Sequence, residues 1–208
     1  MRHTVICIGR ESGSGGKVIG QEVAKRLGIE FYDSNLLEMA KEYGGITSDS
    51  LDKSDEKATN QFYYKLLYEG NENVVQERPA TEMLYQLQSD VIKKIARTHD
   101  CVIVGRCADY VLKDEDVNKI SIFITAPAEA RADRIMKTEN LSNMQAKSFI
   151  KKTDTRRKNY YNYFSKQKWG GKDNYDMTIN SHSLGIEGTT DLICQIYKNY
   201  LKKSKNNN

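Results

Sequence analysis

Short apolar runs alternate along this chain with segments in which apolar residues recur at helical spacing. Five runs have the length and β-branched content of strands: Thr4–Gly9, Ile29–Tyr32, Cys101–Gly105, Lys119–Thr125 and Asp176–Asn180. Helical spacing is found between them, over residues 18–27, 36–40, 81–97 and 186–201. Strands that alternate with helices form parallel sheets covered on both faces. The pattern therefore predicts an α/β fold with a parallel sheet of about five strands.

The segment after the first predicted strand is rich in glycine. It contains, in order, Gly9, Arg10, Glu11, Ser12, Gly13, Ser14, Gly15, Gly16, Lys17 and Val18. Glycines let consecutive backbone N–H groups turn toward one anion, and the N-terminus of the following helix adds partial positive charge at the same point. All of these residues except Glu11 are therefore candidates for binding the phosphates of a nucleotide.

The spacing departs from the phosphate-loop motif G-x-x-x-x-G-K-[ST]. In that motif the lysine contacts the β- and γ-phosphates and the hydroxyl binds Mg²⁺. When Lys17 takes the lysine position, Gly16 fits the preceding glycine, but Glu11 replaces the first glycine and Val18 replaces Ser or Thr. This register keeps the cation and lacks the hydroxyl.

A second register matches the segment Ser12–Gly15. Gly16 then takes the lysine position, and Lys17 follows one residue late. Both registers stay open, and Arg10 is a further candidate for the missing phosphate contact. The dinucleotide fingerprint G-x-G-x-x-G is disfavoured, because Val18 stands where its third glycine belongs.

Charged residues follow the other predicted strands. Asp33 follows the second strand, Arg106 follows the third, and Arg131 and Arg134 lie on one helical face after the fourth. A further charged cluster contains Asp154, Arg156, Arg157 and Lys158. Ligands bind at the carboxyl ends of parallel strands, and phosphoryl transfer needs charge neutralisation around phosphate oxygens. These residues are therefore candidates for a phosphate site.

Composition narrows the setting. The 208 residues fit a single domain, and Lys and Arg exceed Asp and Glu by only four charges, which suits a small anionic ligand better than nucleic acid. There is no apolar run of membrane-spanning length and no signal-peptide pattern at the N-terminus, so a cytoplasmic protein without a membrane partner is expected. The four cysteines form no C-x-x-C pair, and Cys7 and Cys101 are expected to be small buried apolar residues. We expect no metal-ligating residues, and the absence of a G-x-S-x-G sequence disfavours a serine hydrolase.

Four segments resemble the cytidylate kinase-like family of nucleoside monophosphate kinases. They are Gly9–Lys17 with Phe31–Asp33, Val102–Arg106, Thr125–Met136 and Asn180–Glu187. The third is the most specific and is similar to the strand and lid helix of cytidylate kinases, with both arginines in place. Residues 151–157 resemble the acidic and arginine-rich turn of the lid, and residues 160–161 and 169–171 resemble the kinase-like branch.

The resemblance implies a single domain of the P-loop NTPase type over residues 1–208. It would contain a helical acceptor-binding insertion over 34–98, a lid over 137–175 and a frayed tail over 202–208. The implied reaction is transfer of the γ-phosphoryl group from ATP, with Mg²⁺, to a nucleoside monophosphate or another small phosphorylated or hydroxylated acceptor. The oligomeric state is left open.

The same resemblance assigns roles to the candidate residues. The glycine loop holds the donor phosphates, and the implied catalytic residues are Lys17, Arg131, Arg134, Arg156 and Arg157. The implied substrate-binding residues are Asp33, Arg106 and Asp154. Cytidylate kinases have an aspartate at the position of Cys107. The alternative is a nucleotide-binding regulatory protein, which needs the loop but not the full set of arginines; their presence favours the enzyme.

Overall fold

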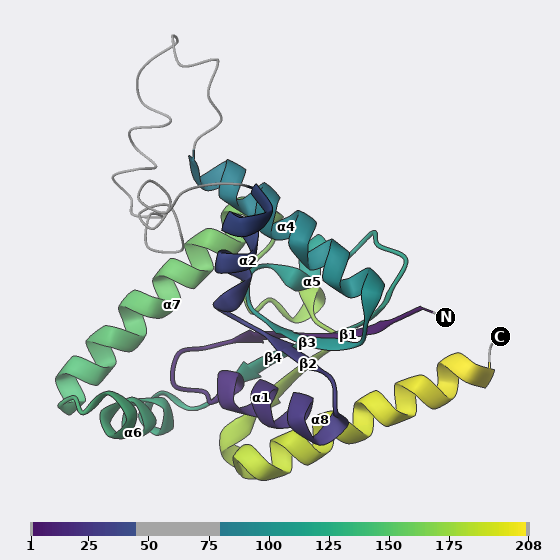
Figure 1. The fold of residues 1–208 in the computed structure, drawn as a ribbon. Coiled ribbons are helices and arrows are strands. Elements are labelled where there is room, and N and C mark those ends of the chain that lie inside the picture. The colour runs from purple at the N-terminus through teal and green to yellow at the C-terminus, as the bar shows by residue number, and fades with distance from the viewer. Residues whose placement is uncertain (1, 45–79, 207–208) are drawn as a thin grey trace, which may run out of the picture.

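The structure is a computed structural model that describes residues 2–44 and 80–206 (Figure 1). Five strands form one sheet: β1 (Thr4–Arg10), β2 (Glu30–Tyr32), β3 (Cys101–Val104), β4 (Asn118–Thr125) and β5 (Met177–Asn180). Their order across the sheet is β2-β3-β1-β4-β5, and all neighbouring strands are parallel. The predicted fold class is confirmed, and each strand boundary lies within one residue of the expected one.

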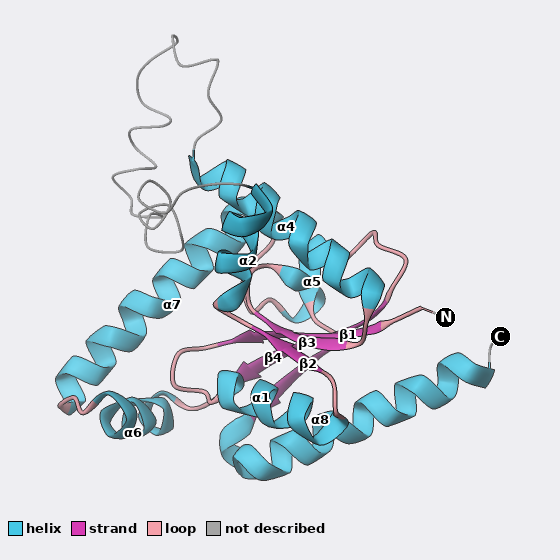
Figure 2. Ribbon diagram, viewed as in Figure 1, coloured by secondary structure: helices cyan, strands magenta, loops and turns pink. Residues whose placement is uncertain are grey.

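Helices connect the strands and surround the sheet (Figure 2). They are α1 (Gly16–Leu27), α2 (Asn35–Gly44), α4 (Ala80–Thr98), α5 (Ala108–Val111), α6 (Ala128–Glu139), α7 (Asn143–Ser165) and α8 (Ser181–Asn206), with a 3-10 turn η1 at Lys172–Asn174. Among the described residues, none of these helices has both the length and the apolarity needed to cross a bilayer.

The central strand β1 has a buried residue on each face at every step. Ile6 and Ile8 pack into a core with α1 and α8, whereas Val5 and Cys7 pack into a second core with α2, α4 and α5. Figure 1 shows these two groups of helices on opposite sides of the sheet. Burying one such isoleucine contributes about 1.5–3 kcal/mol, so the two cores hold the ends of β1, β3 and β4 in fixed positions. All four cysteines are buried and free, which agrees with the expectation for Cys7 and Cys101.

The C-terminal helix is longer than the pattern predicts. The expected range 186–201 covers only its middle, because Gly185, with φ 70° and ψ 176°, kinks the helix and separates a first turn that begins at Ser181. Residues 202–206, expected as a frayed tail, are helical. They carry no apolar periodicity, which is why the pattern ended at Leu201.

The structure bears on two further expectations, for the insertion and for the lid. Of the insertion expected over 34–98, residues 45–79 lie outside the described residues, and α2 and α4 are helical and contribute Leu36, Ala40, Val91 and Ile92 to the second core. Residues 151–157, expected as a turn of the lid, lie inside α7, so that expectation is wrong. A helix is favoured there because residues 143–165 contain no glycine or proline.

The helices α6 and α7 form a pair that extends away from the sheet (Figure 1). Small residues make the contact, because Ala132 of α6 and Ala146 of α7 are fully buried between the two helices. The start of α7 is fixed by a capping box, in which the Ser142 side chain and the Gln145 side chain each accept a hydrogen bond from the other's backbone N–H. α7 and only the last turn of α6 lie within the region 137–175 that was expected to form a lid, and we call α6 and α7 the lid helices.

Candidate phosphate-transfer site

The glycine loop, residues 11–15, joins β1 to α1. Gly13 and Gly15 have φ angles of 79° and 84°, which side chains with a Cβ rarely adopt. A Cβ at Gly13 would lie 2.6 Å from the backbone oxygen of Arg131, and one at Gly15 would overlap Ile186. No side chain among the described residues caps the N-terminus of α1. The first N–H groups of this helix therefore favour an anion.

Side chains within the loop fasten it to β4 and α8. The Glu11 N–H donates to the oxygen of Ile124 at 3.0 Å, and the Glu11 carboxylate accepts a hydrogen bond from Thr125. The Ser14 hydroxyl donates to the oxygen of Glu11 at 2.8 Å, and the Ser181 hydroxyl donates to the oxygen of Ser14 at 2.6 Å. Ser14 is fully buried, so its hydroxyl stabilises the shape of the loop.

Two cations beside the loop share one carboxylate. Arg10 Nη2 donates to Asp33 Oδ1 at 3.3 Å, and Lys17 Nζ lies 3.1 Å from Asp33 Oδ2. The two cations differ in exposure: the side chain of Arg10 is 12% exposed and that of Lys17 is 54% exposed. Arg10 therefore lies inside the site, whereas Lys17 lies at its edge.

The lid helices contact the loop directly. Arg131 Nη1 donates to Asp154 Oδ2 at 2.6 Å and to the oxygen of Ser12 at 3.2 Å. Asp154 Oδ1 in turn accepts the Ser12 N–H at 2.7 Å, and Arg134 Nη1 donates to the oxygen of Gly13. The expected grouping of both arginines and Asp154 around the loop is thus observed, in an arrangement where a lid carboxylate binds a backbone N–H of the loop.

Burial changes the ionisation of this cluster. It raises the pKa of the Asp154 carboxyl, against the opposing hydrogen bonds from Ser12 N–H and Arg131, and it lowers the pKa of Arg134. Arg157 Nη1 donates to the backbone oxygen of Arg10 at 3.3 Å. This contact joins the charged segment 154–158 of α7 to the end of β1. Charges in such a partly desolvated region interact more strongly than they do in water.

A narrow cavity lies next to the loop, at the carboxyl ends of β1 and β3. It is lined by Gly9, Arg10, Gly105, Arg106, Cys107, Asp109, Arg157, Tyr160, Tyr161, Trp169 and Tyr175. Asp109 is 8% exposed, and its carboxylate accepts a hydrogen bond from the Tyr161 hydroxyl at 2.6 Å. Burial raises the pKa of Asp109, and it also raises the pKa values of Tyr161 and Tyr175. The three arginines beside the aromatic wall can bind a small anion, but the cavity volume of about 20 Å³ holds about one water molecule, so a larger group needs the lining side chains to move.

The backbone after β3 is strained where it enters this cavity. Gly105, Arg106 and Cys107 have φ angles of 80°, 58° and 55° in succession. Non-glycine residues in the left-handed region cost on the order of 1–3 kcal/mol each, and such strain gathers at functional sites. The strain places the buried Arg106 side chain in the cavity lining.

The structure brings most of the candidates from the sequence together, with clear differences among them. Val18 is 49% exposed on α1 and gives no polar group to the site. The sequence analysis missed Glu11, Ser181 and Asp109. Ser181 was inside a segment quoted for the family resemblance, and Asp109 follows Arg106 by three residues. For Asp109, the signal was its position shortly after the third predicted strand.

Comparison with known proteins places this geometry in a class. The five-stranded parallel sheet with its surrounding helices has the same fold as shikimate kinase from Bacteroides thetaiotaomicron, which aligns with a TM-score of 0.53 and 12% identity, over 94% of this chain and 98% of that one. The family model of the cytidylate kinase-like family matches residues 5–183, so the chain belongs to that family.

Individual relatives share about a quarter of their aligned residues with this chain. The cytidylate kinase of Methanocaldococcus jannaschii is 25% identical over 203 residues, which cover 96% of this chain and 99% of the relative. An uncharacterised protein from Eubacterium ventriosum has a solved structure that aligns with a TM-score of 0.68 and 26% identity, over 93% of this chain and 98% of that one. The family and these relatives support a nucleotide kinase-like phosphotransferase with nucleotide and small-molecule substrates.

Proposed function

We propose that this chain transfers the γ-phosphoryl group of ATP to a small phosphorylated acceptor, with nucleoside monophosphates as the first candidates. The supporting observation is the contact between three parts of the site. The glycine loop, at the uncapped N-terminus of α1, contacts Arg131 and Asp154 of the lid helices. Arg10, which directly precedes the loop, lines the same cavity as Arg106. A donor and an acceptor phosphate could therefore be held side by side.

The proposed roles follow from position. Backbone N–H groups of Gly13, Gly15 and Gly16 bind the donor phosphates, together with the N-terminus of α1, whereas the Ser14 N–H donates to the oxygen of Glu11. Arg106 binds the acceptor phosphate, and Asp33 borders the acceptor at the end of β2. The remaining arginines neutralise the charge of the transferring group: Arg131, Arg134, Arg156 and Arg157. Exchange of the Asp154 contact for a phosphate oxygen would let the lid close over the donor and exclude water.

Magnesium fits this site as an ion carried on the nucleotide. Among residues 2–44 and 80–206, no group of three or more His, Cys, Asp or Glu side chains could hold a metal. Mg²⁺ in phosphotransferases is held by one or two carboxylates, by substrate phosphates and by water. Both oxygens of Asp33, the carboxylate beside the loop, are paired with Arg10 and Lys17, so nucleotide phosphates and water would hold the ion. Bound Mg²⁺ would neutralise charge on the β- and γ-phosphate oxygens.

A coupled assay of ADP release tests the proposal. The full chain is supplied with ATP, Mg²⁺ and each nucleoside monophosphate in turn, and release should depend on one acceptor or a small group of acceptors. Arg106→Met is the test variant, since it removes the guanidinium and keeps a side chain of similar length at the left-handed position. We expect a rise in the acceptor KM of on the order of a hundredfold, with a smaller change in ATP affinity.

The regulatory alternative gives a different result in the same assay. A nucleotide-binding protein without turnover would bind ATP and release no ADP with any acceptor. It would also show no dependence on Arg106, because that side chain lies in the cavity and not in the loop.

A further inference from the structure

The structure distinguishes the two registers of the phosphate loop. In the motif, the glycine before the lysine directly precedes the helix and has a backbone conformation that disfavours side chains. Gly15 meets both conditions, because it is the N-cap of α1 and has a φ angle of 84°. Counting back from Gly15 in G-x-x-x-x-G-K places Arg10 at the first glycine and Gly16 at the lysine position. The lysine position is therefore occupied by Gly16, which has no side chain. The first glycine position is occupied by Arg10, which has a long cationic one.

These two positions are neighbours in space. A Cβ built on Gly16 would lie 2.5 Å from the Cβ of Arg10 and 3.1 Å from its Cγ. The first distance is shorter than packed carbon atoms allow, and the second is tighter than most carbon contacts. The stem of Arg10 therefore fills the volume into which a side chain at position 16 would extend.

The surroundings of the Arg10 guanidinium are shaped to receive it. Gly105 has φ 80°, and a Cβ there would overlap Arg10 Nη1. Nη2 is held by Asp33 at 3.3 Å, and the side chain is only 12% exposed. The Nε atom is buried and has no hydrogen-bond partner among the described residues. A buried donor of this kind has capacity for an acceptor such as a phosphate oxygen.

We propose that Arg10 replaces the missing P-loop lysine, so that positions 10 and 16 have exchanged the cation and the glycine of the motif. The guanidinium then contacts the donor phosphates while Asp33 fixes its position. Lys17, at the exposed edge of the site, has a lesser role. This inference rests on the proposed use of ATP, and it names the residue that binds the donor.

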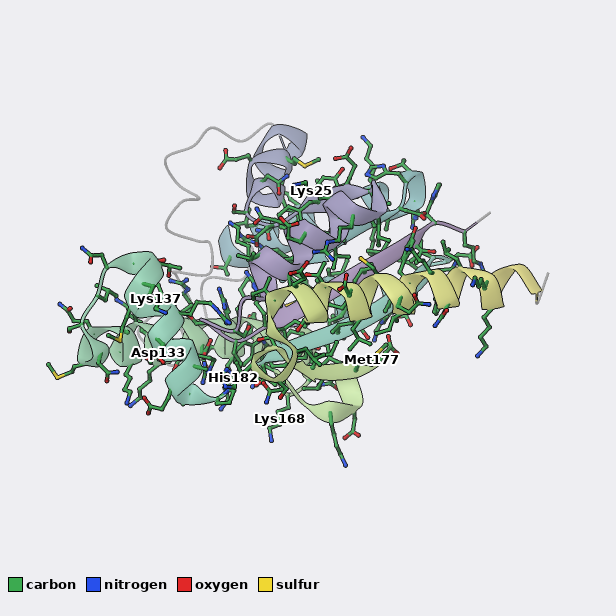
Figure 3. All side chains as sticks on the ribbon, turned by 90° about the horizontal axis from the view of Figure 1, so that it is seen from below. Lys25, Asp133, Lys137, Lys168, Met177 and His182 are labelled. Atoms are coloured by element: carbon green, nitrogen blue, oxygen red, sulfur yellow. The ribbon has the colours of Figure 1, made fainter. Side chains whose placement is uncertain are left out.

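The first test compares single cations in direct binding of Mg·ATP, measured by titration calorimetry without an acceptor. Arg10→Met should weaken binding by on the order of a hundredfold, as expected for loss of a charged contact to a phosphate. Lys17→Met should weaken it by less than about fivefold, the size of an exposed ion pair. Lys25→Met is the charge-matched control, because Lys25 is exposed near the far end of the same helix (Figure 3). It lies about 13 Å along α1 from Gly16, so the control should bind Mg·ATP as the parent does.

The second test moves the cation back. Gly16→Lys alone should weaken binding, since its Cβ would collide with Arg10. The double variant Arg10→Gly with Gly16→Lys restores both glycines and the lysine of the motif and removes the collision, while Lys17 still stands at the Ser or Thr position. It should recover at least about tenfold of the affinity lost in Arg10→Gly, which corresponds to about 1.4 kcal/mol. Melting curves of every variant check that the compared proteins are folded.

The outcomes separate this inference from the proposed function. Parent-like ATP affinity in Arg10→Met, or a folded double variant that recovers nothing beyond Arg10→Gly, would overturn the role of Arg10. If the parent releases no ADP with any acceptor and Arg10→Met still loses affinity, the proposed function fails and the inference stands. If Arg10→Met keeps both affinity and turnover, the inference fails alone.

Discussion

The glycine loop and the lid helices meet at one site, but different forces shape them. The loop is defined by absent side chains, because Gly13 and Gly15 adopt backbone angles and close contacts that a Cβ would not allow. The lid contributes charged side chains, of which Arg131 and Asp154 are the main contacts to the loop. Substitutions in the loop should therefore act through shape and stability, whereas substitutions in the lid should act through charge and turnover.

The largest effect is expected from Gly13→Ala. The added methyl group meets the backbone oxygen of Arg131 at 2.6 Å, in a backbone conformation that already disfavours it. We expect a loss of on the order of 3 kcal/mol in the free energy of unfolding, together with loss of ATP binding. Thermal melting and nucleotide titration measure the two effects.

Gly28→Ala is the matched control for this prediction. Gly28 has φ 66° at the end of α1, and a Cβ there would meet nothing within 4 Å. Gly28→Ala should therefore lower the free energy of unfolding by only about 1 kcal/mol, the cost of the left-handed conformation, and leave ATP binding unchanged. Equal effects of the two substitutions would show that the close contact of the loop with α6 has no importance.

The lid should show the opposite balance, with a large change in turnover and a small one in stability. Arg131→Ala removes a guanidinium that faces Asp154 and the loop, and kcat should fall about a hundredfold, or about 3 kcal/mol of transition-state stabilisation. Lys137→Ala, on an exposed position of the same helix (Figure 3), should change kcat by less than about twofold. A fall in melting temperature with kcat per folded molecule unchanged would make Arg131 a structural ion-pair residue.

Sequence reasoning succeeded where local pattern decides the structure. The five strands and the glycine loop have signals within a few residues, so their positions and their common edge of the sheet could be predicted. The length of α7 could not, because charged residues such as Lys151 and Arg157 are typical of both exposed helices and turns. The proposed exchange between Arg10 and Gly16 was also beyond the spacing alone, since two registers stayed open until the φ angle of Gly15 was known.

The smallest effect is expected at the contact between the two regions, from the pH dependence of Asp154→Asn. Burial raises the pKa of Asp154 above its unfolded value, so its stabilising contribution is present below about pH 4 and is lost as the pH rises through the raised pKa. The amide keeps an acceptor for the Ser12 N–H and does not titrate. The melting temperature of Asp154→Asn relative to the parent should therefore rise by a few degrees from about pH 4 to neutral pH. A difference that falls over this range would mean that Arg131 holds the pKa of Asp154 below its usual value.

Phosphorus NMR of the full chain with ATP, Mg²⁺ and the preferred acceptor tests the central claim most directly, because it follows the phosphoryl group itself. The account predicts that ADP and the phosphorylated acceptor appear in equal amounts, with little inorganic phosphate, since the arginines position the acceptor and the lid excludes water. ATP that binds and stays intact with every acceptor, or that yields inorganic phosphate in place of a phosphorylated acceptor, would contradict it.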